Sequence, residues 1–111
     1  MDADTFWRDG AVVARAVFDQ PAMSVIGDVV ERMLENPSPR AITASPPGRP
    51  RFVEDFCNWQ TYPELLEVMS PLAELAGRLM RSQTVRLYHD HVLNKDPGAS
   101  QRTPWHQDQP F

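Results

Sequence analysis

The residues best suited to metal chemistry lie in the last quarter of the chain. His106 and Asp108 are two positions apart, and the other two histidines, His89 and His91, precede them closely. Residues i and i+2 of a strand share one face, so an imidazole and a carboxylate at this spacing can converge on one point. They would supply two ligands of the two-histidine, one-carboxylate triad that holds non-haem Fe(II) and leaves coordination positions open. A lone His-x-Asp also occurs by chance, as a surface turn that binds no metal.

His89 and His91 allow other interpretations. Together with His106 they could form a three-histidine site, which is typical of zinc and of hydrolysis. On a half-apolar strand, histidines at this spacing are commonly structural and held by hydrogen bonds. The residues alone leave these alternatives open.

The segment that must position His89 and His91 is predicted to be a strand over residues 84–95. It contains neither Pro nor Gly and is rich in β-forming residues, and a turn at 96–98 ends it. Odd-numbered side chains then share one face with the two histidines. The even-numbered residues Tyr88, Asp90 and Asn94 are expected to face the opposite layer.

The first half of the chain predicts a helical turn, a strand and a longer helix. The turn is expected at residues 4–8 and the strand at 11–18. Asp19 is suited to cap the helix that follows, with Pro21 inside the first turn. Apolar residues then recur at helical spacing until Asn36-Pro37 ends the helix.

A proline-rich loop is predicted over residues 36–50, because five of the 11 prolines fall there and proline removes backbone donors. A strand or extended segment is expected at 51–58. The capping box Thr61-x-x-Glu64 and the Ser70-Pro71 pair then predict two short helices, 62–68 and 71–81.

Composition restricts the class of protein. The chain has 111 residues, which fits one small domain or a piece of a larger one. Its net charge is −4 and it has a single lysine, so nucleic-acid binding has no electrostatic support. No apolar run approaches the ~20 residues that span a bilayer, and no secretory signal is visible. The single cysteine excludes an internal disulfide framework, and we expect a cytoplasmic location.

The C-terminal quarter resembles the phytanoyl-CoA dioxygenase family. The resemblance is carried by the run Tyr-His-Asp-His-Val-Leu-Asn-Lys-Asp-Pro-Gly at 88–98, followed by Thr-Pro-Trp-His-Gln-Asp-Gln-Pro-Phe at 103–111. Residues 6–10, 51–59 and 70–81 are similar to the family's opening and middle segments. The resemblance therefore extends over essentially the whole chain.

The resemblance implies an α+β chain that contains N-terminal helices and the first strands of a double-stranded β-helix, or jelly roll. Residues 1–111 would be the N-terminal part of a single domain of this family. His106 and Asp108 would be iron ligands, His91 would contact 2-oxoglutarate, and His89 would line the same pocket. The family's second histidine ligand and its 2-oxoglutarate-binding arginine have no counterpart within the chain, so residues 1–111 alone are expected to be inactive.

The implied function of the complete protein is that of an Fe(II)- and 2-oxoglutarate-dependent dioxygenase. It would use dioxygen to hydroxylate an unactivated C–H bond of a small organic substrate. The alternatives are a truncated, non-enzymatic relative and, from the three histidines, a zinc-dependent hydrolase.

Overall fold

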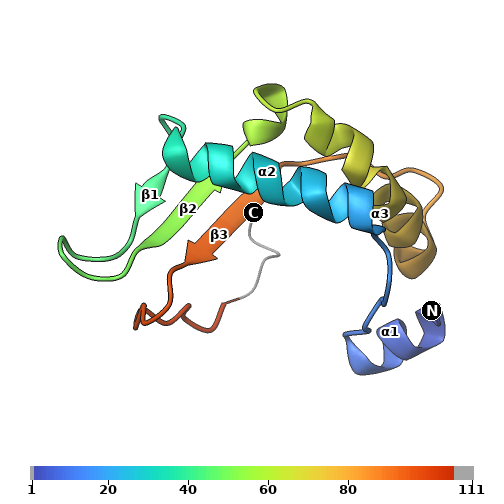
Figure 1. Cartoon of the computed structure of the whole chain (residues 1–111). Coiled ribbons are helices and arrows are strands. Elements are labelled where there is room, and N and C mark those ends of the chain that lie inside the picture. The colour runs from blue at the N-terminus through green and yellow to red at the C-terminus, as the bar shows by residue number, and fades with distance from the viewer. Residues whose placement is uncertain (1, 107–111) are drawn as a thin grey trace.

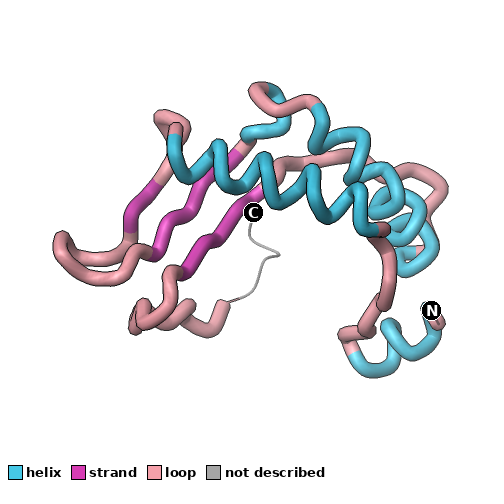
Figure 2. Tube along the Cα trace, in the orientation of Figure 1, coloured by secondary structure: helices cyan, strands magenta, loops and turns pink. Residues whose placement is uncertain are grey.

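The computed structural model describes residues 2–106 and has an α+β architecture, as predicted. An antiparallel sheet of order β1–β2–β3 is crossed by α2, α2 packs on α3, and α1 packs on α3 (Figure 1). Figure 2 shows the three strands side by side, with α2 running across them. The elements are α1 (Ala3–Asp9), α2 (Gln20–Glu35), β1 (Ile42–Thr43), β2 (Phe52–Phe56), the 3₁₀ turn η1 (Asn58–Gln60), α3 (Glu64–Met80) and β3 (His91–Lys95). Over residues 2–106, none of the helices has the length and apolar character needed to cross a bilayer.

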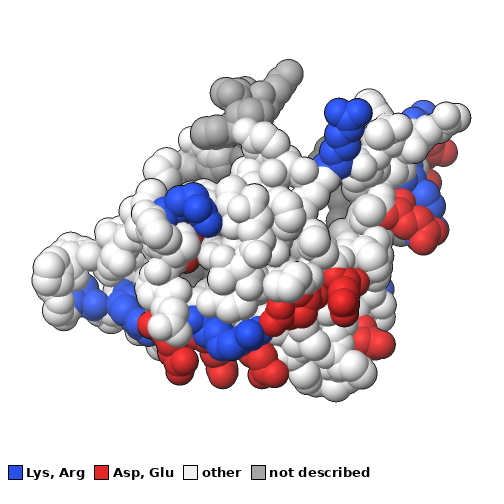
Figure 3. Space-filling view, turned by 90° about the horizontal axis from the view of Figure 1, so that it is seen from above, with Lys and Arg blue, Asp and Glu red and all other residues white. Residues whose placement is uncertain are grey.

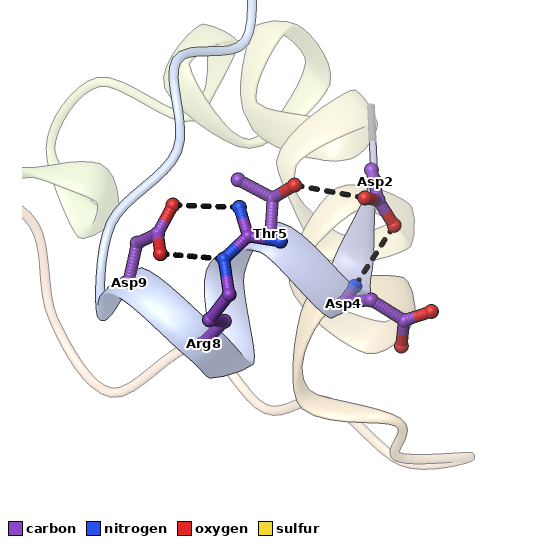
Figure 4. A network of polar contacts seen from close by, with 5 residues as sticks. All are labelled: Asp2, Asp4, Thr5, Arg8 and Asp9. Carbon is purple, nitrogen blue, oxygen red and sulfur yellow. Dashed lines mark hydrogen bonds and ion pairs between the residues drawn. The ribbon is translucent and has the colours of Figure 1, made fainter.

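The N-terminal helix α1 confirms the helical turn predicted at 4–8 and is capped by its own sequence. The Asp2 carboxylate accepts hydrogen bonds from the Asp4 amide at 2.9 Å and the Thr5 hydroxyl at 2.8 Å (Figure 4). Near the other end, Arg8 donates two hydrogen bonds to Asp9. The Trp7 indole N–H donates to the carbonyl of Leu79 at 2.8 Å, so α1 is attached to the end of α3.

The predicted strand at 11–18 is wrong, because these residues form an irregular connection between α1 and α2. A strand needs a neighbouring backbone to pair with, and none of the described residues offers one to this segment. Ala16 adopts a left-handed φ of 53°, which interrupts any extended run. Val13 remains 71% exposed. The β-forming composition was outweighed by the lack of a partner.

Helix α2 confirms its predicted start and end. The Asp19 side chain accepts from the Ala22 amide at 2.9 Å, and Asn36 ends the helix. Val29 and Met33 are buried against Leu65 of α3, and these three residues form the core of the molecule. Arg32 also forms an ion pair with Glu64 of α3. Seen from above, acidic and basic side chains lie next to one another along one border of the molecule (Figure 3).

The two short helices predicted at 62–68 and 71–81 are instead one helix, α3, with Pro71 inside it. The capping box does not form, since Pro63 occupies the N-cap position and its side chain has no oxygen to accept a hydrogen bond from the helix amides. Pro71 removes only the bond that its own amide would make to the carbonyl of Glu67. Leu65 and Met69, in the turns just before this position, pack on the core formed with α2, and this burial favours one continuous helix.

The proline-rich loop 36–50 is confirmed in outline, although residues 42–43 within it form the short strand β1. Its first part is fixed to β2 through Asp55, which is 3% exposed. The Asp55 carboxylate accepts from the Ser38 amide at 2.9 Å and from the Ser38 hydroxyl at 2.5 Å. Arg40 donates to the carbonyl of Phe56 at 2.9 Å. These bonds hold the loop on the β1 side of β2.

Acid should weaken this attachment. Burial by itself raises the pKa of Asp55, but the hydrogen bonds that its carboxylate accepts, those from Ser38 first, together outweigh burial and hold that pKa below its ordinary value of 3.8. The stability that Asp55 contributes is therefore fully present above that value and is lost as the pH falls through the folded-state pKa. We expect Asp55→Ala to lower the free energy of unfolding by about 2–4 kcal/mol at neutral pH. Urea unfolding of both proteins from neutral pH to pH 3 measures the effect. Equal stability at neutral pH, or a difference that does not shrink in acid, would contradict the assignment.

Candidate functional site

Only the last part of the predicted strand 84–95 is a strand, since β3 begins at His91. Pairing with β2 starts at Phe56 opposite His91, and beyond Phe56 the chain turns away into η1. Within the described residues nothing pairs with 84–89. The turn predicted at 96–98 is confirmed: the Ala99 amide donates to the carbonyl of Asp96, and Gly98 has the positive φ, 86°, that this turn requires.

The start of β3 is attached to the end of β2 through Asp90, which is 9% exposed. Its carboxylate accepts from the amides of Asn58 at 3.1 Å and Trp59 at 2.9 Å. Its carbonyl accepts from the amide of Cys57 at 3.1 Å. The side chain therefore accepts the hydrogen bonds of two η1 amides that have no acceptor within that short turn. The expectation that Asp90 faces the layer opposite His91 is confirmed.

At the far end, Arg51 and Asp96 close the same pair of strands. The Asp96 amide donates to the carbonyl of Arg51 at 2.9 Å, and the guanidinium of Arg51 lies 3.0 Å from the Asp96 carboxylate. The hydrogen bond from Arg51 lowers the pKa of Asp96. With Asp90 at one end and Asp96 at the other, the register of β3 is fixed over its whole length.

This register places the odd-numbered side chains of β3 on the outer face of the sheet. His91, Leu93 and Lys95 are exposed there, whereas Val92 points to the other side and packs on the helical core. Phe56 of β2 lies on the same outer face as His91, and their ring centroids are 4.0 Å apart in a stacked arrangement.

The outer face forms one wall of a groove of about 1010 Å³, at the upper end of the ~300–1,000 Å³ range of ligand pockets. The segment 103–106 forms another wall. The groove brings together the three sequence-predicted histidines that the structure describes, His89, His91 and His106. The other lining residues are Glu54, Phe56, Cys57, Leu93, Lys95, Thr103 and Pro104.

His91 contacts two residues of β2. Besides stacking on Phe56, its Nε2 lies 3.5 Å from an oxygen of Glu54. His89 is farther away, with its ring centroid 6.3 Å from that of His91. Sequence reasoning missed Glu54 and Phe56, although the buried Val53 and Asp55 alternate with them along β2. Such alternation indicates which side chains share a face but not which strand lies opposite.

The ring of His106 is oriented by a backbone carbonyl. Its Nδ1 lies 2.8 Å from the carbonyl oxygen of Pro104. A carbonyl can only accept a hydrogen bond, so Nδ1 carries the proton and, in the neutral ring, Nε2 carries the lone pair. Metal-ligating histidines typically donate their other ring N–H to a backbone carbonyl in this way.

The other predicted ligand, Asp108, lies outside the described residues. Among residues 2–106, no three His, Cys, Asp or Glu side chains are grouped so that they could hold one metal ion. The three-histidine alternative, His89 with His91 and His106, therefore gains no support from the geometry.

Comparisons with models of protein families, with curated proteins and with solved structures gave no match to this chain.

Removing the carboxylate of Asp90 should destabilise the fold. Asp90→Ala leaves two amides of η1 without their acceptor, and we expect a loss of about 3 kcal/mol in the free energy of unfolding. Asp28→Ala is the control, because Asp28 is exposed on α2 and should change stability by less than about 0.5 kcal/mol. Chemical denaturation compares the two variants. Similar stabilities for both would mean that Asp90 does not anchor β3.

The tautomer of His106 can be observed directly. We expect the neutral ring to be protonated at Nδ1, because this nitrogen donates to Pro104. The ¹⁵N chemical shifts of the two ring nitrogens, measured by long-range ¹H–¹⁵N correlation, distinguish the tautomers. A ring protonated at Nε2 would contradict the hydrogen bond and the ligand geometry inferred from it.

Proposed function

We propose that this chain forms the groove of an Fe(II)- and 2-oxoglutarate-dependent dioxygenase, which hydroxylates an unactivated C–H bond of a small organic substrate. The observation that carries the proposal is the position of His106. Its Nδ1 is held by the carbonyl of Pro104, and its ring lines the same groove as His91.

The donor set fits iron. His106 and Asp108 would hold the metal with one imidazole and one carboxylate, which are ligand types that suit a redox-active Fe(II) centre. Bound iron would supply the oxidising chemistry, with 2-oxoglutarate decarboxylated to succinate as dioxygen is consumed. The chain's own contribution is to fix the ring orientation of His106 through the carbonyl of Pro104.

His91 is suited to bind the cosubstrate. It faces the groove, its ring is immobilised on Phe56, and Glu54 lies beside Nε2. A ring already restrained by a stacked neighbour on one face can contact 2-oxoglutarate with little further loss of side-chain freedom. His89 lines the same groove and would contact the cosubstrate or the substrate.

The walls of the groove favour a substrate with an apolar part. Phe56 and Leu93 offer apolar surface between the histidines, and Leu93 is 50% exposed. Apolar walls with a few placed polar groups are typical of small-molecule sites.

A jelly roll is part of the proposal, and the outer edge of β3 supports it. The bonds from Cys57 to Asp90 and from Asp96 to Arg51 show that even-numbered residues turn their backbone groups toward β2. The backbone groups of His91, Leu93 and Lys95 therefore point the other way. No described strand pairs with this edge, so a further strand of a double-stranded β-helix can be added there.

The test is formation of succinate from 2-oxoglutarate by the full-length protein with Fe(II) and dioxygen. Full length is needed because His106 and Asp108 provide only two of the iron ligands. We expect His106→Ala to lower the rate by about 100-fold or more. Arg102→Ala is the matched control, since Arg102 is exposed in the same segment but does not line the groove.

Two results would contradict the proposal. One is a wild-type protein that forms no succinate with Fe(II); a protein that is active only with zinc would be such a case. The other is His106→Ala protein that keeps the wild-type rate.

A further inference from the structure

Lys95, the last residue of β3, is bonded to the segment that carries His106. Its Nζ donates to the carbonyl of Gln101 at 3.0 Å and to the hydroxyl of Thr103 at 3.4 Å. The ammonium also lies 4.5 Å from the centroid of the Phe52 ring. Phe52 is 4% exposed and is paired with Lys95 across the strands, so the base of the lysine is fixed by the sheet.

These bonds close a loop. The chain reverses at the turn beginning with Asp96 and returns along the groove, and Lys95 joins the strand before the turn to the segment after it. Thr103 and Pro104 then form a wall of the groove, and Pro104 in turn holds the ring of His106. An uninterrupted series of contacts thus runs from the rigid sheet to the imidazole.

The contacts at position 95 require a positively charged side chain with more than one N–H donor. The two acceptors are a carbonyl and a hydroxyl on different residues, and the third contact is the face of an aromatic ring, which attracts a positive charge. A neutral side chain of the same length keeps the packing on Phe52 but cannot donate to Gln101. An arginine can do both, because its guanidinium has several N–H donors and stacks on aromatic faces.

We propose that Lys95 is a positioning residue for the metal site: it sets the place of His106 by fixing the segment 99–106 on the sheet. This inference rests on the proposed function, because it takes His106 to be a metal ligand. Lys95 acts through Gln101, Thr103 and Pro104 and needs no contact with the metal.

The test compares Lys95→Met and Lys95→Arg with the wild-type full-length protein. Arg102→Met is the matched control, because it removes one positive charge from the same segment outside the groove. Thr103→Val is a milder variant that removes one acceptor of the lysine. Two quantities are measured: amide hydrogen exchange over residues 99–106, and broadening of the His106 ring resonances by Mn²⁺. Exchange in α2 reports whether the fold is intact.

We expect Lys95→Met to speed exchange over 99–106 and to weaken Mn²⁺ binding at His106 by about 10-fold, as for other residues that orient a ligand. Exchange in α2 should not change. Lys95→Arg should restore most of the affinity, Thr103→Val should give an intermediate loss, and Arg102→Met should behave as wild type.

Wild-type Mn²⁺ affinity in Lys95→Met would overturn the positioning role, as would failure of Lys95→Arg to restore a lost affinity. A wild-type protein whose His106 resonances do not respond to Mn²⁺ would instead overturn the proposed function, and with it the inference that rests on it. The Mn²⁺ titration of the wild-type protein alone distinguishes failure of the proposed function from failure of the positioning role.

Discussion

The groove depends on the buried carboxylate of Asp90. It accepts hydrogen bonds from the amides of Asn58 and Trp59, and so attaches the start of β3 to the end of β2. This contact fixes which residue of β3 lies opposite Phe56. Because side chains alternate along a strand, a slip of one residue would move His91 from the groove to the helical core.

With the register fixed, the two faces of the sheet serve different purposes. The face that carries Val92 packs on α2 and α3 and contributes to the core. The face that carries His91 and Phe56 is left to form the groove. The long helices therefore stabilise the site without contributing side chains to it, and the polar groups needed for binding are supplied by the strands and by the returning segment that ends at His106.

Local signals in the sequence predicted some elements and could not predict others. Asp19 and the helical periodicity that follows it identified α2, because capping and amphipathicity are properties of consecutive residues. Residues 11–18 have the composition of a strand, but pairing depends on a distant partner that composition does not reveal. The single helix through Pro71 was missed for the same reason, since its packing on α2 outweighs the proline. The spacing of His89 and His91 predicted that they share a face, and the family resemblance implied that this face lies beside His106. Glu54 could be identified only once the register of β2 and β3 was known.

The central claim is that His91 and His106 face one binding site for metal and 2-oxoglutarate. The most direct measurement is a crystal structure of the full-length protein with Mn²⁺ and 2-oxoglutarate, obtained without dioxygen. We expect the metal to be bound by Nε2 of His106 and 2-oxoglutarate to lie in the groove within hydrogen-bonding distance of His91. Metal bound elsewhere, or 2-oxoglutarate outside this groove, would contradict the claim.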